Sequence, residues 1–299
     1  MKHILFTKEL LLSAVALFAI IATSCIREDL DQCYTLKLKV ENIKGDDITE
    51  YGWMESTDLY IFDENLNYLE KRSLDKNFSR SRNEIVLDGY TADRSLRIVA
   101  WGNVNALGEK QSVSEAQTIE DLKVMLKSQD GLAVTPDSLY YGSEQVFTKA
   151  GGVAKETEIV IRPKVGTVTI ETRGLQEQLG RMGLRSSVDC DFYLNNTLSG
   201  FDYRGTQIGD SVYYNPEGAW NESGVEWITP TCPGQDMAVS ISANGVSLGS
   251  AKVDENGDPI YTSAGENTHL ILEWGEGGTL SVRATVRPWG VVEEDIPMH

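Results

Sequence analysis

The side chains that most often carry catalysis or bind metal are scarce in this sequence. Among its 299 residues are three histidines and four cysteines. A Ser-His-Asp or Cys-His site would have to use His269, because His3 lies in an N-terminal leader and His299 at the last position. His269 lies within the alternating run NTHLILEW, which favours a histidine on a β-sheet. There is no HExxH zinc motif and no GxxxxGK phosphate loop, so we expect no catalytic residue and no metal site.

Acidic side chains, by contrast, are abundant, and the net charge is −18. The run DENGDP, residues 254–259, has acids at calcium-loop spacing. Pro259 stands where an EF-hand loop has glycine, and Gly265 stands where that loop has its final acid. We therefore expect a solvated hairpin turn. Carboxylates are too common here for a glycosidase pair to be singled out, and the negative charge disfavours nucleic acid as a partner.

The N-terminus has the pattern of a secretory signal. Lys2 and Lys8 give a positive start, and residues 10–22 are apolar except for Ser13. This run is too short for a membrane-spanning helix, which needs roughly twenty residues. The sequence therefore predicts a signal peptide at residues 1–24.

Small residues lead directly into Cys25 in the stretch ATSC. This arrangement resembles the bacterial lipobox, in which cleavage, here between Ser24 and Cys25, leaves the cysteine as a lipid-bearing first residue. Each buried CH₂ of an acyl chain contributes about 0.8 kcal/mol, so several chains hold firmly. Arg27, Glu28 and Asp29 follow and resemble the surface-export signal of Bacteroidetes lipoproteins, an ordinary solvated linker being the alternative. We expect a covalent lipid on Cys25 and a surface-exposed location at the outer membrane.

Three further cysteines remain once Cys25 is lipidated, and three cannot all pair within one chain. An exported location permits disulfides. Cys190 and Cys232 lie in the same half of the chain, which favours a bond between them, with Cys33 left over. Two buried free thiols are the alternative.

Most of the chain alternates between apolar and polar residues, as β-strands do. In residues 34–42, YTLKLKVEN, the residues Leu36, Leu38 and Val40 share one face. Asn-Gly and Asp-Gly pairs mark turns. Similar strand-like runs occur at residues 57–63, 83–89, 95–103, 157–163, 166–173, 237–245, 268–275 and 279–289. The fold class predicted is all-β with few short helices.

Two helices interrupt this pattern. Thr118 and Asp121 could cap a helix over residues 119–129, and a shorter helix fits residues 174–183. Pro163 disfavours a central strand position, and the alternation restarts beyond it. We therefore predict two tandem β-sandwich domains, at residues 33–162 and 163–299, after a lipidated linker at residues 25–32.

Six tryptophans raise the alternative of a surface glycan-binding lipoprotein. Most lie within strand patterns, where core packing is the expected role. An exposed sugar-stacking platform would best fit the loop-rich run YYNPEGAWNESGVEW, residues 213–227.

Taken in order, several motifs resemble those of the fimbrial anchor lipoproteins of Bacteroidetes, which hold type V pili to the outer membrane. The motifs are CIREDLDQC, DLYIFDENLNYL, VAWGN, SLYYGSEQVF, IVIRPKVGTVTIE and VRATVRPWGVVEEDI. One departure is that Lys164 follows Pro163 directly, where a small residue is expected first. The resemblance implies two transthyretin-like β-sandwiches, no catalysis, no cofactor besides the lipid, a pilin partner and an influence on fibre length.

Binding of this kind works by strand addition, in which main-chain hydrogen bonds and side-chain pockets suffice. The strand at residues 279–287 is followed by Pro288 and then by WGVVEEDIPMH, which extends over about 36 Å. We hypothesise that this tail, or an open sheet edge beside it, pairs with the basal pilin. The alternative is a tail folded back on its own domain through Trp289.

Overall fold

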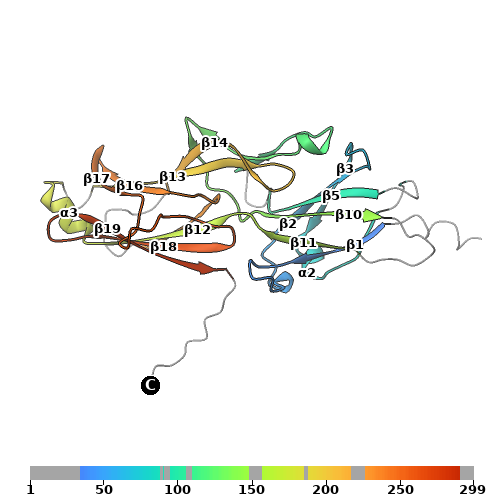
Figure 1. Ribbon diagram of the computed structural model, residues 1–299, viewed down its shortest axis with the longest axis horizontal. Helices are drawn as coiled ribbons and strands as arrows, with labels where there is room; N and C mark the ends of the chain where they lie inside the picture. Colours follow the sequence, from blue (N-terminus) through green and yellow to red (C-terminus); the bar gives the residue numbers. More distant parts are fainter. Residues whose placement is uncertain are drawn as a thin grey trace, which may run out of the picture.

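The computed structural model is an elongated molecule of two β-sandwiches placed end to end (Figure 1). The residues that the structure describes are 34–87, 90, 95–105, 110–147, 157–184, 188–216 and 226–289. The predicted signal peptide, the cleavage site at Ser24 and Cys25, and the export signal of Arg27, Glu28 and Asp29 lie outside them.

Seven strands form the first sandwich, in the order β3-β2-β5-β10-β11-β1-β4. Strand β11 joins its two layers, because it pairs with β1 over most of its length and with β10 at its last two residues. A short helix α2 (Lys76–Arg80) and a 3-10 turn η2 (Thr49–Tyr51) complete the domain. The strands are β1 (Tyr34–Val40), β2 (Ser56–Phe62), β3 (Tyr68–Asp75), β4 (Ile85–Leu87), β5 (Ser95–Gly102), β10 (Tyr140–Phe147) and β11 (Thr157–Pro163).

Alternation along β1 builds the core of this sandwich. Leu36, Leu38 and Val40 are buried, whereas the residues between them are half exposed, as the sequence pattern predicts. They belong to one apolar cluster with Ile61 of β2 and Ile98 of β5. Burial of such aliphatic side chains stabilises the fold by about 1.5–3 kcal/mol each.

The second sandwich has a four-stranded sheet, β15-β12-β18-β19, facing a larger sheet that contains β17-β16-β13-β14-β9-β8. Helix α3 (Leu175–Arg181) follows β12 and confirms the shorter predicted helix. The strands of the smaller sheet are β12 (Gly166–Arg173), β15 (Glu226–Thr231), β18 (Glu266–Trp274) and β19 (Leu280–Pro288). Those of the larger sheet are β8 (Ser128–Gln129), β9 (Leu132–Ala133), β13 (Cys190–Phe201), β14 (Gln207–Tyr214), β16 (Ala238–Ala243) and β17 (Val246–Ala251).

The longer predicted helix, over residues 119–129, is wrong. Thr118 and Asp121 do form a capping box, but it starts only a 3-10 turn, η3 (Ile119–Asp121). The chain continues as β7 (Val124–Leu126), which pairs with the end of β13 and with β6 (Gln111–Val113). Two alternate side chains of β7 are buried in the second core, so packing against a distant strand outweighs the local helix signal.

The two sandwiches are not cleanly divided at residue 162. Strands β6 to β9 belong by sequence to the predicted first domain, yet they join the larger sheet of the second sandwich. The outer face of β2 and β5 also contributes Phe62, Val99 and Trp101 to the second apolar cluster. Strand β5 is therefore buried on both faces, and the second apolar cluster includes residues of both domains.

Candidate functional site

His269 lies on the sheet, as its sequence context predicts. It stands in register between Thr169 of β12 and Thr285 of β19, and its Nε2 is 3.4 Å from Oε2 of Glu171. No group of three or more His, Cys, Asp and Glu side chains that could hold a metal occurs in the part of the chain that the structure describes. Within the same residues no helix is long and apolar enough to cross a membrane.

The calcium-like run DENGDP is a solvent-exposed hairpin turn, as predicted. Oδ1 of Asp254 accepts hydrogen bonds from the amides of Asn256 at 2.8 Å and Asp258 at 3.0 Å. These donors, first among them the Asp258 amide, hold the pKa of the Asp254 carboxyl below its usual value. The Asp254 carboxylate therefore accepts hydrogen bonds from backbone amides of its own turn.

The predicted Cys190–Cys232 disulfide is not formed, and both residues are buried free thiols. Cys190 begins β13 opposite Ala243, whereas the Cys232 amide bonds to the hydroxyl of Tyr214, a residue paired with Leu194 further along β13. The two thiols therefore contact different parts of the core. Burial raises the pKa of Cys190 to about 11 and that of Cys232 to about 12, so both stay protonated and unreactive.

Strand β19 is the last strand of its sheet and lies on the edge that the sequence singled out for partner binding (Figure 1). It pairs antiparallel with β18 from Leu280 to Pro288. Val282 is buried, whereas Ser281 and Arg283 are exposed, so the predicted alternation is confirmed.

Backbone groups on β19 alternate between β18 and the outer edge. The Val282 carbonyl accepts a hydrogen bond from the Glu255 amide at 2.7 Å, and Glu255 lies in the hairpin turn on the outer side. In contrast, the amide of Trp289 bonds toward the β18 side, to the Gly265 carbonyl at 2.7 Å. Even-numbered residues therefore direct their backbone groups outward, and Ala284 follows Val282 in this set. The hairpin turn contacts this edge at Val282.

The end of β19 matches the expected role of Pro288 and fixes the start of the tail. Pro288 is the last residue of the strand and has an outward position, where its missing N–H removes no bond to β18. Trp289 folds back on its own sandwich, because its indole Nε1 donates to Oγ1 of Thr167 at 3.2 Å. Residues 290–299 lie outside the described residues.

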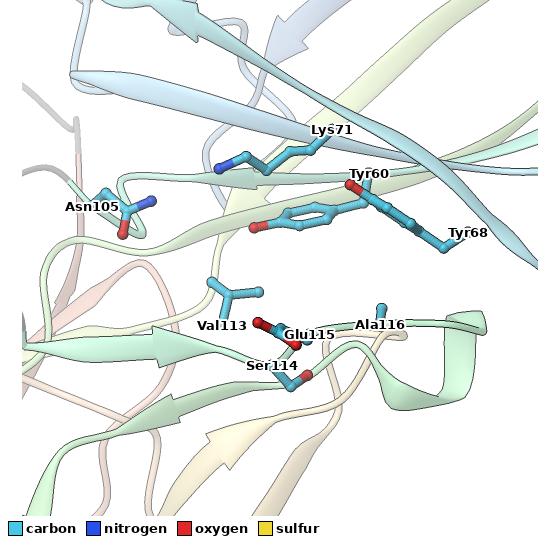
Figure 2. Close-up of a pocket in the computed structure, with 8 residues that line it drawn as sticks. All are labelled: Tyr60, Tyr68, Lys71, Asn105, Val113, Ser114, Glu115 and Ala116. Carbon is cyan, nitrogen blue, oxygen red and sulfur yellow. The ribbon is translucent and has the colours of Figure 1, made fainter.

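A hollow of about 490 Å³ opens between the first sandwich and the β6–β7 ribbon (Figure 2). Tyr60, Lys71 and Asn105 line one wall, and the loop with Glu115 lines the other. Lys71 and Asn105 both contact the buried carboxylate of Asp58, at 3.4 Å and 3.2 Å. This arrangement offers polar contacts, but its lining contains no paired nucleophile and base.

The four tryptophans whose side chains the structure describes fall into two groups. Trp101 and Trp274 are buried in the core, as expected. Trp53 and Trp289 instead line a hollow at the domain junction. Most of the run 213–227, where a sugar platform would best fit, lies outside the described residues.

Comparison with known proteins identifies relatives over nearly the whole chain. Residues 30–295 match the model of a family described as fimbrillin-A associated anchor proteins Mfa1 and Mfa2. The major fimbrium anchoring subunit FimB of Porphyromonas gingivalis is 26% identical over 280 residues, which cover 90% of this chain and 91% of FimB.

Solved structures share the fold at low sequence identity. A proposed polysaccharide-binding protein from Bacteroides thetaiotaomicron superimposes with a TM-score of 0.64 at 16% identity, covering 88% of this chain and 99% of that protein. The fimbrial anchor protein Mfa2 from Porphyromonas gingivalis gives a TM-score of 0.55 at 15% identity, covering 85% and 98% of the two chains.

Proposed function

We propose that this chain attaches a fimbria to the outer membrane. It belongs to the family of fimbrillin-A associated anchor proteins Mfa1 and Mfa2. The observation that carries the proposal is the family match over residues 30–295, together with the name of FimB as a major fimbrium anchoring subunit. An attachment role requires one contact with the membrane and one with the fibre.

The membrane contact is a lipid on Cys25. The stretch between Cys25 and Tyr34 spans at most about 30 Å when extended, so the start of β1 stays close to the bilayer. Strand β1 begins at the outer end of the first sandwich, away from the second (Figure 1). Arg27, Glu28 and Asp29 direct the lipoprotein to the outer surface.

The fibre contact is strand addition by the tail that follows Trp289. Residues 290–299 can extend over about 33 Å, enough for a strand added to a neighbouring sheet. Trp289 itself contacts its own sandwich through Thr167 and Gly265, the feature expected of a tail that folds back, so the proposed strand addition concerns residues 290–299 alone.

Fibre length is limited at the same subunit. Strand β1 is paired with β11 on one side and with β4 on the other, and its alternate residues are buried. While β1 remains in place between β11 and β4, a strand donated by another subunit cannot bind at that position. Growth therefore stops where this subunit is added.

The lipid is tested by Cys25→Ala. We expect this variant to lose label from a palmitate analogue and to leave the membrane fraction, because no acylated thiol remains at the N-terminus. Cys190→Ala is the matched control, since that thiol is buried in the fold. Undiminished labelling of Cys25→Ala would refute the tether.

The fibre contact is tested by truncation after Trp289, which keeps the contacts of that side chain and removes residues 290–299. We expect a folded, membrane-bound protein whose fibres appear in the medium. Electron microscopy of cells and quantification of pilin in the medium provide the measurement. Normal levels of cell-bound fibres would show that the tail is not the contact.

A further inference from the structure

A hollow of about 570 Å³ lies where the two sandwiches meet, at the root of the C-terminal tail. We call it the junction groove and define it by Tyr51, Trp53, Tyr140, Thr167 and Trp289. The first three residues come from the first sandwich and the last two from the second. The tail begins directly after one of its walls.

The groove presents large aromatic side chains to solvent. Tyr51 is 59% exposed and Trp53 is 37% exposed, and their ring centroids lie 5.7 Å apart at an angle of 32°. Tyrosine and tryptophan in such positions are enriched at protein interfaces and often dominate their binding energy. The pair therefore has the composition of a docking surface.

A buried polar network holds this aromatic wall in place. Asn103, with φ of 63° and only 3% exposure, donates from Nδ2 to the carbonyls of Trp53 at 3.1 Å and Ser138 at 2.8 Å. Its Oδ1 accepts from the Glu55 amide at 2.6 Å. The opposite wall is held by the indole bond of Trp289 to Thr167. The groove is thus preformed, which lowers the entropic cost of binding.

Charge at the groove is balanced. Glu55 and Lys76, which also line it, form an ion pair at 2.6 Å. The remaining walls are aromatic or carry neutral hydroxyls. An uncharged, apolar occupant fits this lining better than a charged one.

We propose that the junction groove binds the pilin that receives the C-terminal tail, by taking an uncharged, apolar stretch of that subunit. This inference rests on the proposed function. Trp289 lines the groove and directly precedes the tail, so a subunit that pairs with the first residues of the tail lies beside the groove. The groove then supplies a second contact that fixes the orientation of the pilin on its anchor.

The first test places a photo-crosslinking amino acid in the full-length chain, in cells that assemble fibres. It is inserted at Trp53, at Val291 in the tail, or at Phe147, which is 65% exposed at the end of β10. We expect crosslinks to pilin from positions 53 and 291 and none from 147.

The outcomes separate the two proposals. Crosslinking to pilin from 291 but not from 53 would overturn the groove proposal and leave the proposed function intact. Crosslinking from 53 to the chain's own tail, or to a glycan only, would overturn it as well. If neither 53 nor 291 reaches pilin, the proposed function fails and the groove proposal fails with it.

The second test substitutes the aromatic pair. We expect Tyr51→Ala combined with Trp53→Ala to lower the amount of cell-bound fibre about thirtyfold, the effect of losing one binding hot spot, while the tail crosslink at 291 persists. Trp53→Phe should retain most binding, and Phe147→Ala is the exposed control. Unchanged fibre retention in the double variant, with an unchanged unfolding temperature, would contradict the proposal.

Discussion

At the scale of single residues, aspartate and asparagine side chains shape several turns of this chain. In the part of the chain that the structure describes, four turns have the same arrangement, in which one side-chain oxygen accepts hydrogen bonds from the amides two and four residues further on. The residues that do so are Asn42, Asp63, Asp202 and Asp254. An acid spacing that looks like a cation site in the sequence is therefore a turn signal here, and the sequence alone allowed that interpretation at DENGDP.

Asn103 provides a residue-scale prediction. Its side chain connects the loop before β2 to Ser138, and it is almost fully buried. Asn103→Ala leaves buried backbone groups without partners, so we expect the free energy of unfolding to fall by about 2–3 kcal/mol. Asn244→Ala is the control, since Asn244 also has positive φ but is exposed. Equal losses in denaturant titrations of the two variants would assign the effect to backbone strain alone.

At the scale of elements, strands with one buried face were predictable and β7 was not. Alternation along β1 and β19 is a local signal, and the structure follows it. Thr118 and Asp121 form the capping box that the sequence predicts. The residues after it form strand β7 and not the predicted helix. Besides β6, strand β7 pairs with Gly200 and Phe201 of β13, which lie too far along the chain for a local pattern to reveal the contact.

Strand β19 provides the element-scale prediction. Ala284 directs its amide outward and Thr285 directs its amide to β18, by the alternation that Val282 and Trp289 establish. Thr285→Pro removes a ladder bond and leaves a carbonyl of β18 without its donor, so it should cost about 1–3 kcal/mol. Ala284→Pro removes none, so we expect a markedly smaller loss by thermal unfolding.

The same pair also separates the tail from the edge of β19 as the site of fibre binding. Ala284→Pro should retain cell-bound fibres if the tail makes the contact. Loss of fibres from this stable variant would instead identify the sheet edge as the binding site.

At the scale of the whole molecule, the sequence predicted two sandwiches but not their shared core. The outward-facing side chains of β5 were readable as strand residues, yet nothing in their spacing showed that a second domain would cover them. The junction groove was equally hidden, because Trp53 and Trp289 lie at opposite ends of the chain. The lipidation motif at Cys25 and the tail at residues 290–299 are each contiguous in the sequence, so the proposals about them come from the sequence alone.

Contacts across the junction predict that the two sandwiches unfold together. The rings of Trp101 and Phe201 lie 5.8 Å apart, and the Tyr141 hydroxyl donates to the Tyr203 carbonyl at 2.8 Å. Both rings of the first pair are buried in the second apolar cluster. Under the proposed function a fibre would pull on the tail, and this coupling would let both domains share that force.

Phe201→Ala should weaken the coupling, because truncating a buried phenylalanine costs about 3–5 kcal/mol and this one lies at the junction. We expect calorimetry to show one transition for the unaltered chain and two for Phe201→Ala. Phe192→Ala is the matched control, since Phe192 is equally buried but pairs within the second sandwich, opposite Ile241. It should lower the melting temperature and keep a single transition. Two transitions in the unaltered chain would show that the sandwiches are thermodynamically independent despite their shared core.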